Sequence, residues 1–244
     1  MDRIALVTGA GRGIGAATAR ELGRRGYHVV VNYRRDADAA AAVVRAIETD
    51  GGTARAVRAD VCDPGAVADL VDACTRVDAL VCNANIPPPF APLAELSWDD
   101  FAGKVTGELA AVFHVTRLVL ERMRRQGGGG IVYVSSLSAD LLRPGTVAHA
   151  TAKAALDTFA RHVAAEAGRH GIAVNTVAPG PVRTEATAAM RTAETEAAFA
   201  RRSTLGRMLD PEDVATVIAT VLASGFGAVS GARIPVDAGY TVLN

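Results

Sequence analysis

Hydrophobic positions along the chain gather in short β-branched runs that alternate with longer alanine-rich segments. Most of the runs are nearly continuous in apolar residues, as expected of strands covered on both faces. The candidate strands are residues 4–8, 28–33, 54–59, 79–82, 131–135, 173–177 and 233–236. Their alternation with helical segments predicts a doubly wound, seven-stranded parallel sheet with helices on both faces, an α/β fold.

Helix signals lie between these runs. The predicted helices are residues 14–25, 37–49, 65–74, 97–125, 149–169 and 211–223. The last begins with Asp210 as its N-cap and Pro211 in its first turn. Gly26, Gly51 and Gly171 follow helical segments, where glycine commonly ends a helix. Trp98 lies at the start of the longest helical segment and is predicted to be part of the core.

The chain shows no domain boundary. Four glycines at 127–130 connect one helix to one strand inside the alternating pattern, so we interpret them as a flexible surface loop. A chain of 244 residues, half of them hydrophobic, can fill one large α/β domain. We therefore expect a single domain over residues 1–244.

Charge and composition exclude several classes of partner. The chain has 26 basic and 26 acidic residues, so its net field attracts neither nucleic acid nor an anionic membrane surface. The uncharged segment 214–232 is interrupted by glycine, serine and threonine, which argues against a membrane span. Three cysteines without metal-ligand spacing predict reduced thiols and no metal site. The strand at 4–7 leaves no room for a signal peptide, so a cytoplasmic location is expected.

A glycine-rich turn follows the first predicted strand. The segment Thr8-Gly9-Ala10-Gly11-Arg12-Gly13-Ile14-Gly15 joins that strand to a helix. In this context glycines let backbone N–H groups approach a pyrophosphate at a helix N-terminus. The sequence therefore predicts a Rossmann-type dinucleotide site.

The end of the second strand indicates which dinucleotide is bound. Sites for NAD usually have a carboxylate there, about 20 residues after the turn, for the ribose 2′-hydroxyl. This chain has Asn32-Tyr33-Arg34-Arg35 instead. An arginine can bind the 2′-phosphate of NADP through its planar fork, whereas a carboxylate would repel it. The residues favour NADP(H), with a solvated basic loop as the alternative.

The pattern Thr-Gly-x-x-x-Gly-x-Gly at 8–15 resembles the short-chain dehydrogenase/reductase family, and the resemblance extends along essentially the whole chain. It is greatest to bacterial 3-oxoacyl carrier-protein reductases and polyketide ketoreductases. Further matches are Asp60-Val61, the segment from Asn175 through Pro179-Gly180 to Thr184, and the closing run 231–239. The resemblance assigns NADP(H) contacts to Gly9, Gly11, Arg12, Gly13, Ile14, Gly15, Arg34, Asp60, Val61, Asn83, Ala84, Lys153, Pro179, Gly180 and Thr184.

The resemblance also implies an activity and an assembly. Such enzymes reduce a ketone with NADPH, so the expected substrate is a small-molecule or carrier-protein-bound ketone. A homo-oligomer, tetramer or dimer, is implied as well. The segment 181–202, rich in threonine and alanine, is predicted to form a mobile lid over the substrate.

The catalytic positions that the resemblance implies are partly altered. Family catalysis uses Asn, Ser, Tyr and Lys, and here the serine is Ser136 and the lysine Lys153. The tyrosine position, four residues before the lysine, is His149, on the same helix face. The helix asparagine aligns with Glu108, which could pair with Lys153. Asn85 replaces a glycine and can adopt its left-handed backbone conformation.

Three hypotheses for His149 remain open. The first is a ketoreductase in which His149 is the acid or a relay and Ser136 the oxyanion donor. Lys153 would lower the pKa of His149 and Glu108 would raise it. The second is a silent NADP-binding subunit, paired with an active homologue. The third is a non-redox dehydratase or cyclase that uses His149 and Glu108 as base and acid.

Overall fold

The computed structural model describes residues 3–243, with only the backbone at 189 and 190. The seven predicted strands form one parallel sheet in the order β3-β2-β1-β4-β5-β6-β7. The strands are β1 (Arg3–Val7), β2 (Tyr27–Tyr33), β3 (Thr53–Arg58), β4 (Ala79–Cys82), β5 (Gly129–Val134), β6 (Ile172–Pro179) and β7 (Arg233–Val236). The predicted fold class is confirmed, and the strand order reverses between β1 and β4, where ligands bind in such sheets. The expected domain, 1–244, includes residues 1, 2 and 244, which lie outside the described residues.

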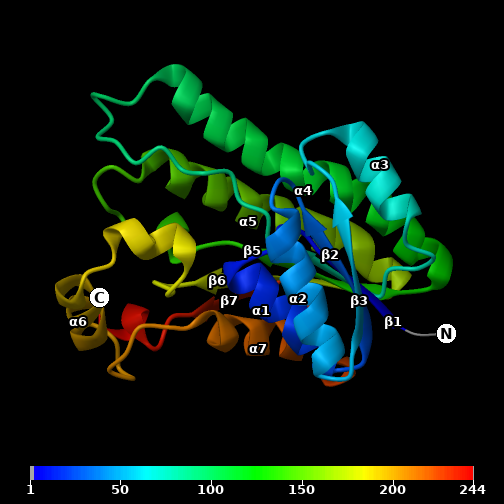
Figure 1. Cartoon of the computed structure of the whole chain (residues 1–244). Helices are drawn as coiled ribbons and strands as arrows, with labels where there is room; N and C mark the ends of the chain where they lie inside the picture. Colours follow the sequence, from blue (N-terminus) through cyan, green and yellow to red (C-terminus); the bar gives the residue numbers. More distant parts are fainter. Residues whose placement is uncertain (1–2, 244) are drawn as a thin grey trace.

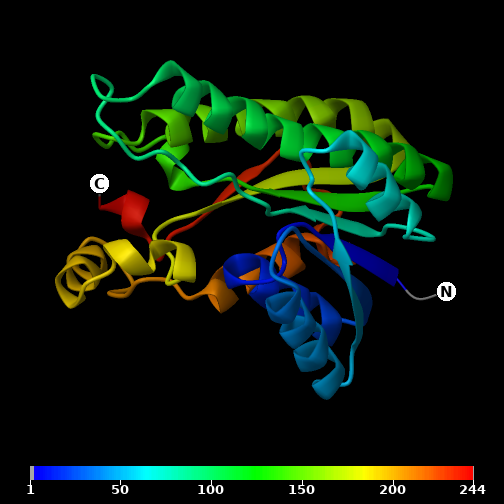
Figure 2. The same cartoon turned by 45° about the horizontal axis from the view of Figure 1, so that its top comes forward.

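Helices cover both faces of the sheet, as Figures 1 and 2 show. They are α1 (Gly13–Arg24), α2 (Ala37–Thr49), α3 (Pro64–Asp72), α4 (Trp98–Gln126), α5 (Val147–Ala167), α6 (Ala193–Arg201) and α7 (Pro211–Val221). Side chains of α3, α4 and α5 share one buried apolar cluster with the sheet. Those of α1, α2 and α7 form a second cluster on the opposite face. The two main parts of the core are therefore apolar layers separated by the strands, and a smaller third cluster contains Leu137, Ala178 and Tyr240.

The helix ends follow the expected signals. Asp210 caps α7 through a reciprocal bond with Asp213, and Pro211 is in the first turn. Gly26, Gly51 and Gly171 have φ of 80°, 84° and 71°, so each takes the left-handed conformation that lets the chain turn away from the preceding helix.

Two local predictions are wrong. Residues 127–130 are not all loop, because Gly129 and Gly130 are the first residues of β5. A Cβ on Gly129 would lie 2.6 Å from Met123 Sδ, so the absent side chain lets α4 pack closely on this strand. Trp98 is not in the core, since it is 73% exposed and stacks only on Phe101 of the same helix.

The segment after β6 contains regular structure that the sequence patterns did not indicate. It folds into a 3-10 helix, η3 (Glu185–Met190), followed by α6. Figures 1 and 2 place this segment at the end of the sheet opposite the N-terminus, the end where the carboxyl termini of the strands lie. Within residues 3–243, no helix is both long and apolar enough to span a membrane.

Candidate active site

The glycine-rich turn after β1 is shaped by close backbone approaches. Gly9 and Gly13 have φ of 62° and 54°, which L side chains rarely adopt. A Cβ on Gly15 would lie 2.5 Å from Gly9 O, so any larger residue would disrupt the turn. The Asn83 side chain ties β4 to this turn by donating to Thr8 O and Gly9 O, at 3.0 Å each. The result is a cradle of backbone at the N-terminus of α1, which fits a dinucleotide pyrophosphate.

The end of β2 has no carboxylate in the position that an NAD site uses. Asn32 is buried there, and its Oδ1 accepts the Gly9 N–H at 3.2 Å. The first acid after the strand, Asp36, caps α2 by accepting from Ala39 N. Arg34 is exposed, with its Nη1 3.6 Å from Asp60 Oδ2. The end of β2 therefore combines an exposed arginine with a buried asparagine and has no carboxylate of its own.

The other residues assigned to the cofactor lie at the carboxyl ends of the strands or in the turns that follow them. Asp60 accepts the Cys62 N–H at 3.0 Å, and Val61 is buried. The Ala84 N–H donates to the Thr8 hydroxyl, and Gly180 N donates to Val236 O. The glycine turn and the first turn of α1 contain Gly11, Arg12 and Ile14, of which Arg12 is exposed. Thr184 lies next to this turn, since its Cγ2 would be 3.5 Å from a Cβ on Gly13, whereas Pro179 is the last residue of β6.

Ser136 follows β5 in an extended conformation and is partly buried. Its Oγ accepts the Ser138 N–H at 3.1 Å, and no acceptor for its own O–H lies among the described residues. Its carbonyl accepts from Arg233, which also contacts Asp157 at 2.7 Å. The Ser138 N–H thus holds the Ser136 hydroxyl in place, and the hydroxyl proton can bind an acceptor on a ligand.

His149 and Lys153 lie one turn apart on α5, as their spacing predicted. The His149 ring is edge-on to Phe90, with centroids 6.1 Å apart. Its Nδ1 is buried and has no hydrogen-bond partner within residues 3–243. Lys153 Nζ donates to Val134 O at 2.8 Å and pairs with Glu108 Oε1 at 2.6 Å. Since an ammonium has three donors, one Lys153 N–H remains open in the described part of the chain.

Glu108 holds two lysines at once. The predicted Glu108–Lys153 pair is present, and the second oxygen of Glu108 binds Lys104 Nζ at 2.5 Å. That oxygen also accepts the Ile86 N–H at 3.2 Å. The three charged side chains are at most 5% exposed. We call Lys104, Glu108 and Lys153 the buried triad.

Asn85 has a different role from the predicted one. Ala238 is the only non-glycine residue with positive φ among those described, so Asn85 does not adopt the left-handed conformation. Its Oδ1 instead accepts a hydrogen bond from Lys104 Nζ at 2.9 Å. Asn85 therefore contributes a side-chain hydrogen bond to Lys104, and it does not use the backbone freedom that a glycine would have at this position.

Burial and charge set the protonation of the site. Burial would raise the pKa of the Glu108 carboxyl, but the charges of Lys153 and Lys104 outweigh it and lower the pKa to about 2. Burial, and then the charges of Lys104 and Lys153, lower the pKa of His149 from 6.5 to about 4. Glu108 offsets only part of that shift. At neutral pH the site holds an uncharged imidazole beside an ionised carboxylate.

Lys104 is the residue that the sequence interpretation missed. Two signals in the sequence point to it. It stands four residues before Glu108, the spacing of an ion pair along a helix. It is also one of only two lysines in the chain, the other being Lys153.

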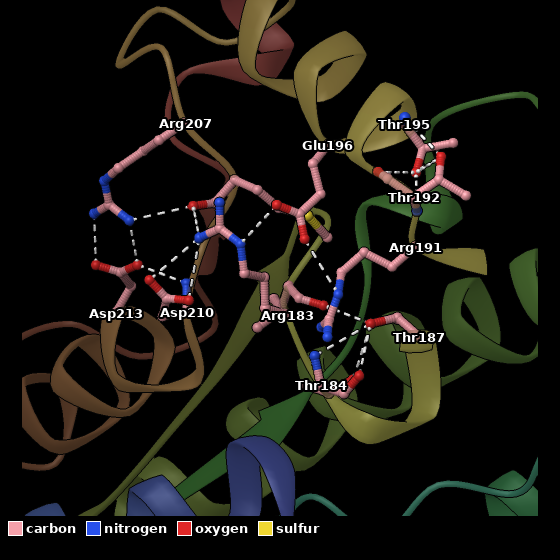
Figure 3. A network of polar contacts seen from close by, with 12 residues as sticks. Arg183, Thr184, Thr187, Arg191, Thr192, Thr195, Glu196, Arg207, Asp210 and Asp213 are labelled. Carbon is pink, nitrogen blue, oxygen red and sulfur yellow. Dashed lines mark hydrogen bonds and ion pairs between the residues drawn. The ribbon is translucent and has the colours of Figure 1, made fainter. Parts of the chain in front are cut away.

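A second set of charged residues holds the segment after β6, and Figure 3 shows it at close range. Arg183 contacts Glu196 of α6 at 3.3 Å and Asp210 before α7 at 3.2 Å. Glu196 also pairs with Arg191, and Arg207 contacts Asp213 at 2.6 Å. Their side chains are 28–49% exposed. We call these six residues the lid network.

Comparisons with known proteins agree with this geometry. A family model described as enoyl-(acyl carrier protein) reductase matches residues 9–241. The chain is 38% identical to a cis-4-hydroxycyclohexanecarboxylate dehydrogenase of Sinomonas cyclohexanicum, over 99% of this chain and 98% of that protein. It is 36% identical to a 3-oxoacyl-[acyl-carrier-protein] reductase of a Synechocystis strain, over 99% of this chain and 98% of that protein.

Solved structures show the same architecture. A short-chain type dehydrogenase/reductase from Mycobacterium ulcerans matches with a TM-score of 0.94 at 29% identity, covering 100% of this chain and 91% of that one. The match along nearly the full length agrees with the strand order and with the glycine turn at the switch point. The chain belongs to the short-chain dehydrogenase/reductase family of oxidoreductases.

Proposed function

We propose that the protein is an NADPH-dependent ketoreductase for a β-ketoacyl or polyketide-like carbonyl, with His149 in the place of the family's tyrosine. The observation that carries the proposal is a pair of side chains one turn apart on α5, each with a polar nitrogen whose hydrogen-bonding capacity the described residues do not use. The Lys153 ammonium has an unused N–H, and the buried His149 ring has an unpartnered nitrogen one turn away. The names of the two relatives, a cyclic-alcohol dehydrogenase and a 3-oxoacyl reductase, support a carbonyl–alcohol reaction.

When bound, NADPH would supply the hydride for the carbonyl carbon, and the residues of the chain would act on the carbonyl oxygen. Ser136 donates its O–H to that oxygen as negative charge develops. His149 acts as an uncharged imidazole, because its pKa of about 4 leaves little imidazolium at neutral pH. Neutral imidazole serves as an electrophile and N–H donor in other enzymes. In this proposal the ring donates its N–H proton to the alkoxide and a proton from bulk solvent replaces it, so that the ketone, the hydride and one solvent proton give the alcohol and the ring ends uncharged.

The test is NADPH oxidation, followed by absorbance, with a β-ketoacyl thioester and a cyclic keto acid. His149→Phe should lower the turnover rate by about 100-fold or more, the scale of general acid catalysis. His162→Phe is the matched control, because His162 is exposed on the same helix. An unchanged rate in His149→Phe would remove His149 from the mechanism. A large gain in His149→Tyr would indicate that the remaining pocket keeps the family's geometry.

The proposed preference for NADP(H) has its own test. Arg34→Ala should weaken NADPH binding about tenfold, because one charge-assisted contact to the 2′-phosphate is lost, and leave NADH binding unchanged. Arg45→Ala, on the exposed face of α2, is the control. Equal affinity of the unaltered protein for NADH and NADPH would contradict the assignment.

A silent NADP-binding subunit is the second candidate, and the uncharged state of His149 favours it. This hypothesis predicts that the protein binds NADPH, as measured by cofactor fluorescence, and does not oxidise it with any ketone. Turnover by the isolated protein would eliminate the hypothesis. The non-redox hypothesis loses support, because Glu108 is ionised and both of its oxygens are engaged. A homo-oligomer, tetramer or dimer, stays a proposal that light scattering can test.

A further inference from the structure

Both lysines of the chain contact one carboxylate. Lys104 and Lys153 are the only lysines among 26 basic residues, and every other basic side chain is arginine. Lys104 comes from α4 and Lys153 from α5, and both ammonium groups lie within 2.6 Å of Glu108. A compact ammonium with three donors suits this enclosed position, whereas the wide planar fork of arginine does not.

Lys104 cannot bind a ligand directly. Its Nζ donates to Glu108 Oε2 at 2.5 Å, to Asn85 Oδ1 at 2.9 Å and to Ile86 O at 2.7 Å. Three donors thus meet three acceptors, and the side chain is fully buried. Any influence of Lys104 on chemistry must act through the residues that it holds.

The charge balance shows what that influence is. Glu108 and Lys153 alone would sum to zero, so the carboxylate would cancel the positive field that the family's lysine exerts beside an uncharged asparagine. Lys104 adds one charge, and the buried triad as a whole carries one net positive charge. Because the triad is buried, this charge is weakly screened and acts on neighbouring groups.

We propose that Lys104 is a charge-compensating positioning residue: it fixes Glu108 against Lys153 and keeps one net positive charge beside His149 and the substrate oxygen. The part that concerns the substrate oxygen rests on the proposed reductase function. The part that concerns His149 does not, since it is a property of the folded protein.

The charged groups that act on His149 are the triad itself. Lys104 and Glu108 act from α4, and Lys153 acts from its own helix, α5. Phe90 contacts the ring from the loop after β4 and carries no charge. Removing Lys104 should therefore raise the pKa of His149, and removing Glu108 should lower it further.

The experiment is an NMR titration of His149 in four proteins, with the signal assigned from its loss in His149→Phe. In Lys104→Met the pKa of His149 should rise by about one unit. In Glu108→Gln it should fall below the unaltered value. In the double variant, Lys153 alone again supplies one positive charge, so the pKa should return close to the unaltered value. Arg117→Met, exposed on α4, is the control for a change on that helix.

Activity gives a second readout through the same four proteins. Lys104→Met should lower the turnover rate about tenfold and give it a new pH dependence as the His149 pKa rises. The double variant should recover most of that loss. A merely structural role predicts losses that add in the double variant and an unchanged His149 pKa, and either result would overturn the proposal. If Lys104→Met does not fold, Glu108→Gln and the double variant still differ in the predicted direction. If no ketone is reduced, the proposed function fails and the titration alone decides on Lys104.

Discussion

The buried triad and the lid network are built from the same interaction, the ion pair, in opposite surroundings. The triad side chains are at most 5% exposed, whereas those of the lid network are 28–49% exposed. Charges removed from water interact strongly, and each one depends on its partners for compensation. Exposed pairs are screened by water and salt, and contribute little individually. The triad can therefore set protonation states, while the lid network joins the segment after β6 to the start of α7 through pairs that water and salt can weaken.

The two regions also differ in the basic residue that they use. The basic residues of the triad are the two lysines of the chain, whereas the basic residues of the lid network are all arginines. Arg183 uses its fork to contact Glu196 of α6 and, in the segment that leads into α7, Asp210 and the Met208 carbonyl. One guanidinium can thus join several exposed elements, which a single ammonium on a flexible stem does less well.

The largest expected effect is on the triad. Glu108→Gln leaves two buried ammonium groups without a carboxylate, which should cost about 3–5 kcal/mol of unfolding free energy. Glu196→Gln makes the same chemical change in the lid network and should cost about 1 kcal/mol or less. Urea unfolding measures both. Equal losses in the two variants would contradict the contrast between the regions.

The next effect is a pH dependence of stability. The folded pKa of His149, about 4, lies below the unfolded value of about 6.5, so the unfolded state binds the proton more readily. Stability should fall as pH drops from about 6.5 to about 4, by on the order of 3 kcal/mol. Glu108 extends the fall from about pH 4 to about pH 2, because its folded pKa is also depressed.

His149→Phe separates these two contributions. Thermal unfolding across pH should show a flatter curve between about pH 6.5 and 4 in this variant, with the lower fall retained. His162→Phe, with its exposed side chain, should leave the curve unchanged. An identical pH dependence in His149→Phe and the unaltered protein would show that His149 is not held uncharged by the fold.

A smaller effect is expected from Arg183→Met. The change removes the contacts that join α6 to the start of α7, but it costs at most about 1 kcal/mol of global stability. Trypsin should nevertheless cleave faster after Arg201 and Arg202, because local opening of the segment becomes easier. Arg45→Met is the control. Cleavage at the original rate would show that the lid network does not fasten this segment.

The smallest effect is that of salt on the unaltered protein. At about 1 M salt the Debye length falls to roughly 3 Å, so exposed pairs weaken and tryptic cleavage of the lid should rise modestly. The His149 pKa should change little, because the triad is enclosed. A larger salt response in the His149 titration than in the cleavage rate would reverse the comparison.

Features encoded by local rules were predictable from the sequence. The strands, their parallel arrangement and most helix ends follow from apolar runs, caps and glycine stops. The Glu108–Lys153 pair was predictable because the family resemblance places position 108 beside the lysine and the two side chains carry opposite charges. The role of Lys104 was not, since its acceptors include Asn85 and the Ile86 carbonyl, which lie in a loop about 20 residues earlier in the chain.

The other incorrect predictions also concern residues whose surroundings are set by the tertiary structure. Gly129 and Gly130 lack the side chains that mark a strand, and they join β5 through backbone pairing with β4 and β6. Asn85 was expected to copy glycine's backbone, but a buried ammonium offered its side chain a stronger contact. Trp98 looked like a core residue by type, and its position at the first turn of α4 left it in solvent.

The sequence by itself determined the doubly wound fold, the glycine turn at the sheet's switch point and the one-turn spacing of His149 and Lys153. Each depends on neighbours along the chain or on residue type, so a linear pattern is sufficient. Only the tertiary structure decided the charge state of that histidine. Burial and the distances among Lys104, Glu108, Lys153 and His149 set its pKa, and those distances exist only once α4 and α5 pack side by side.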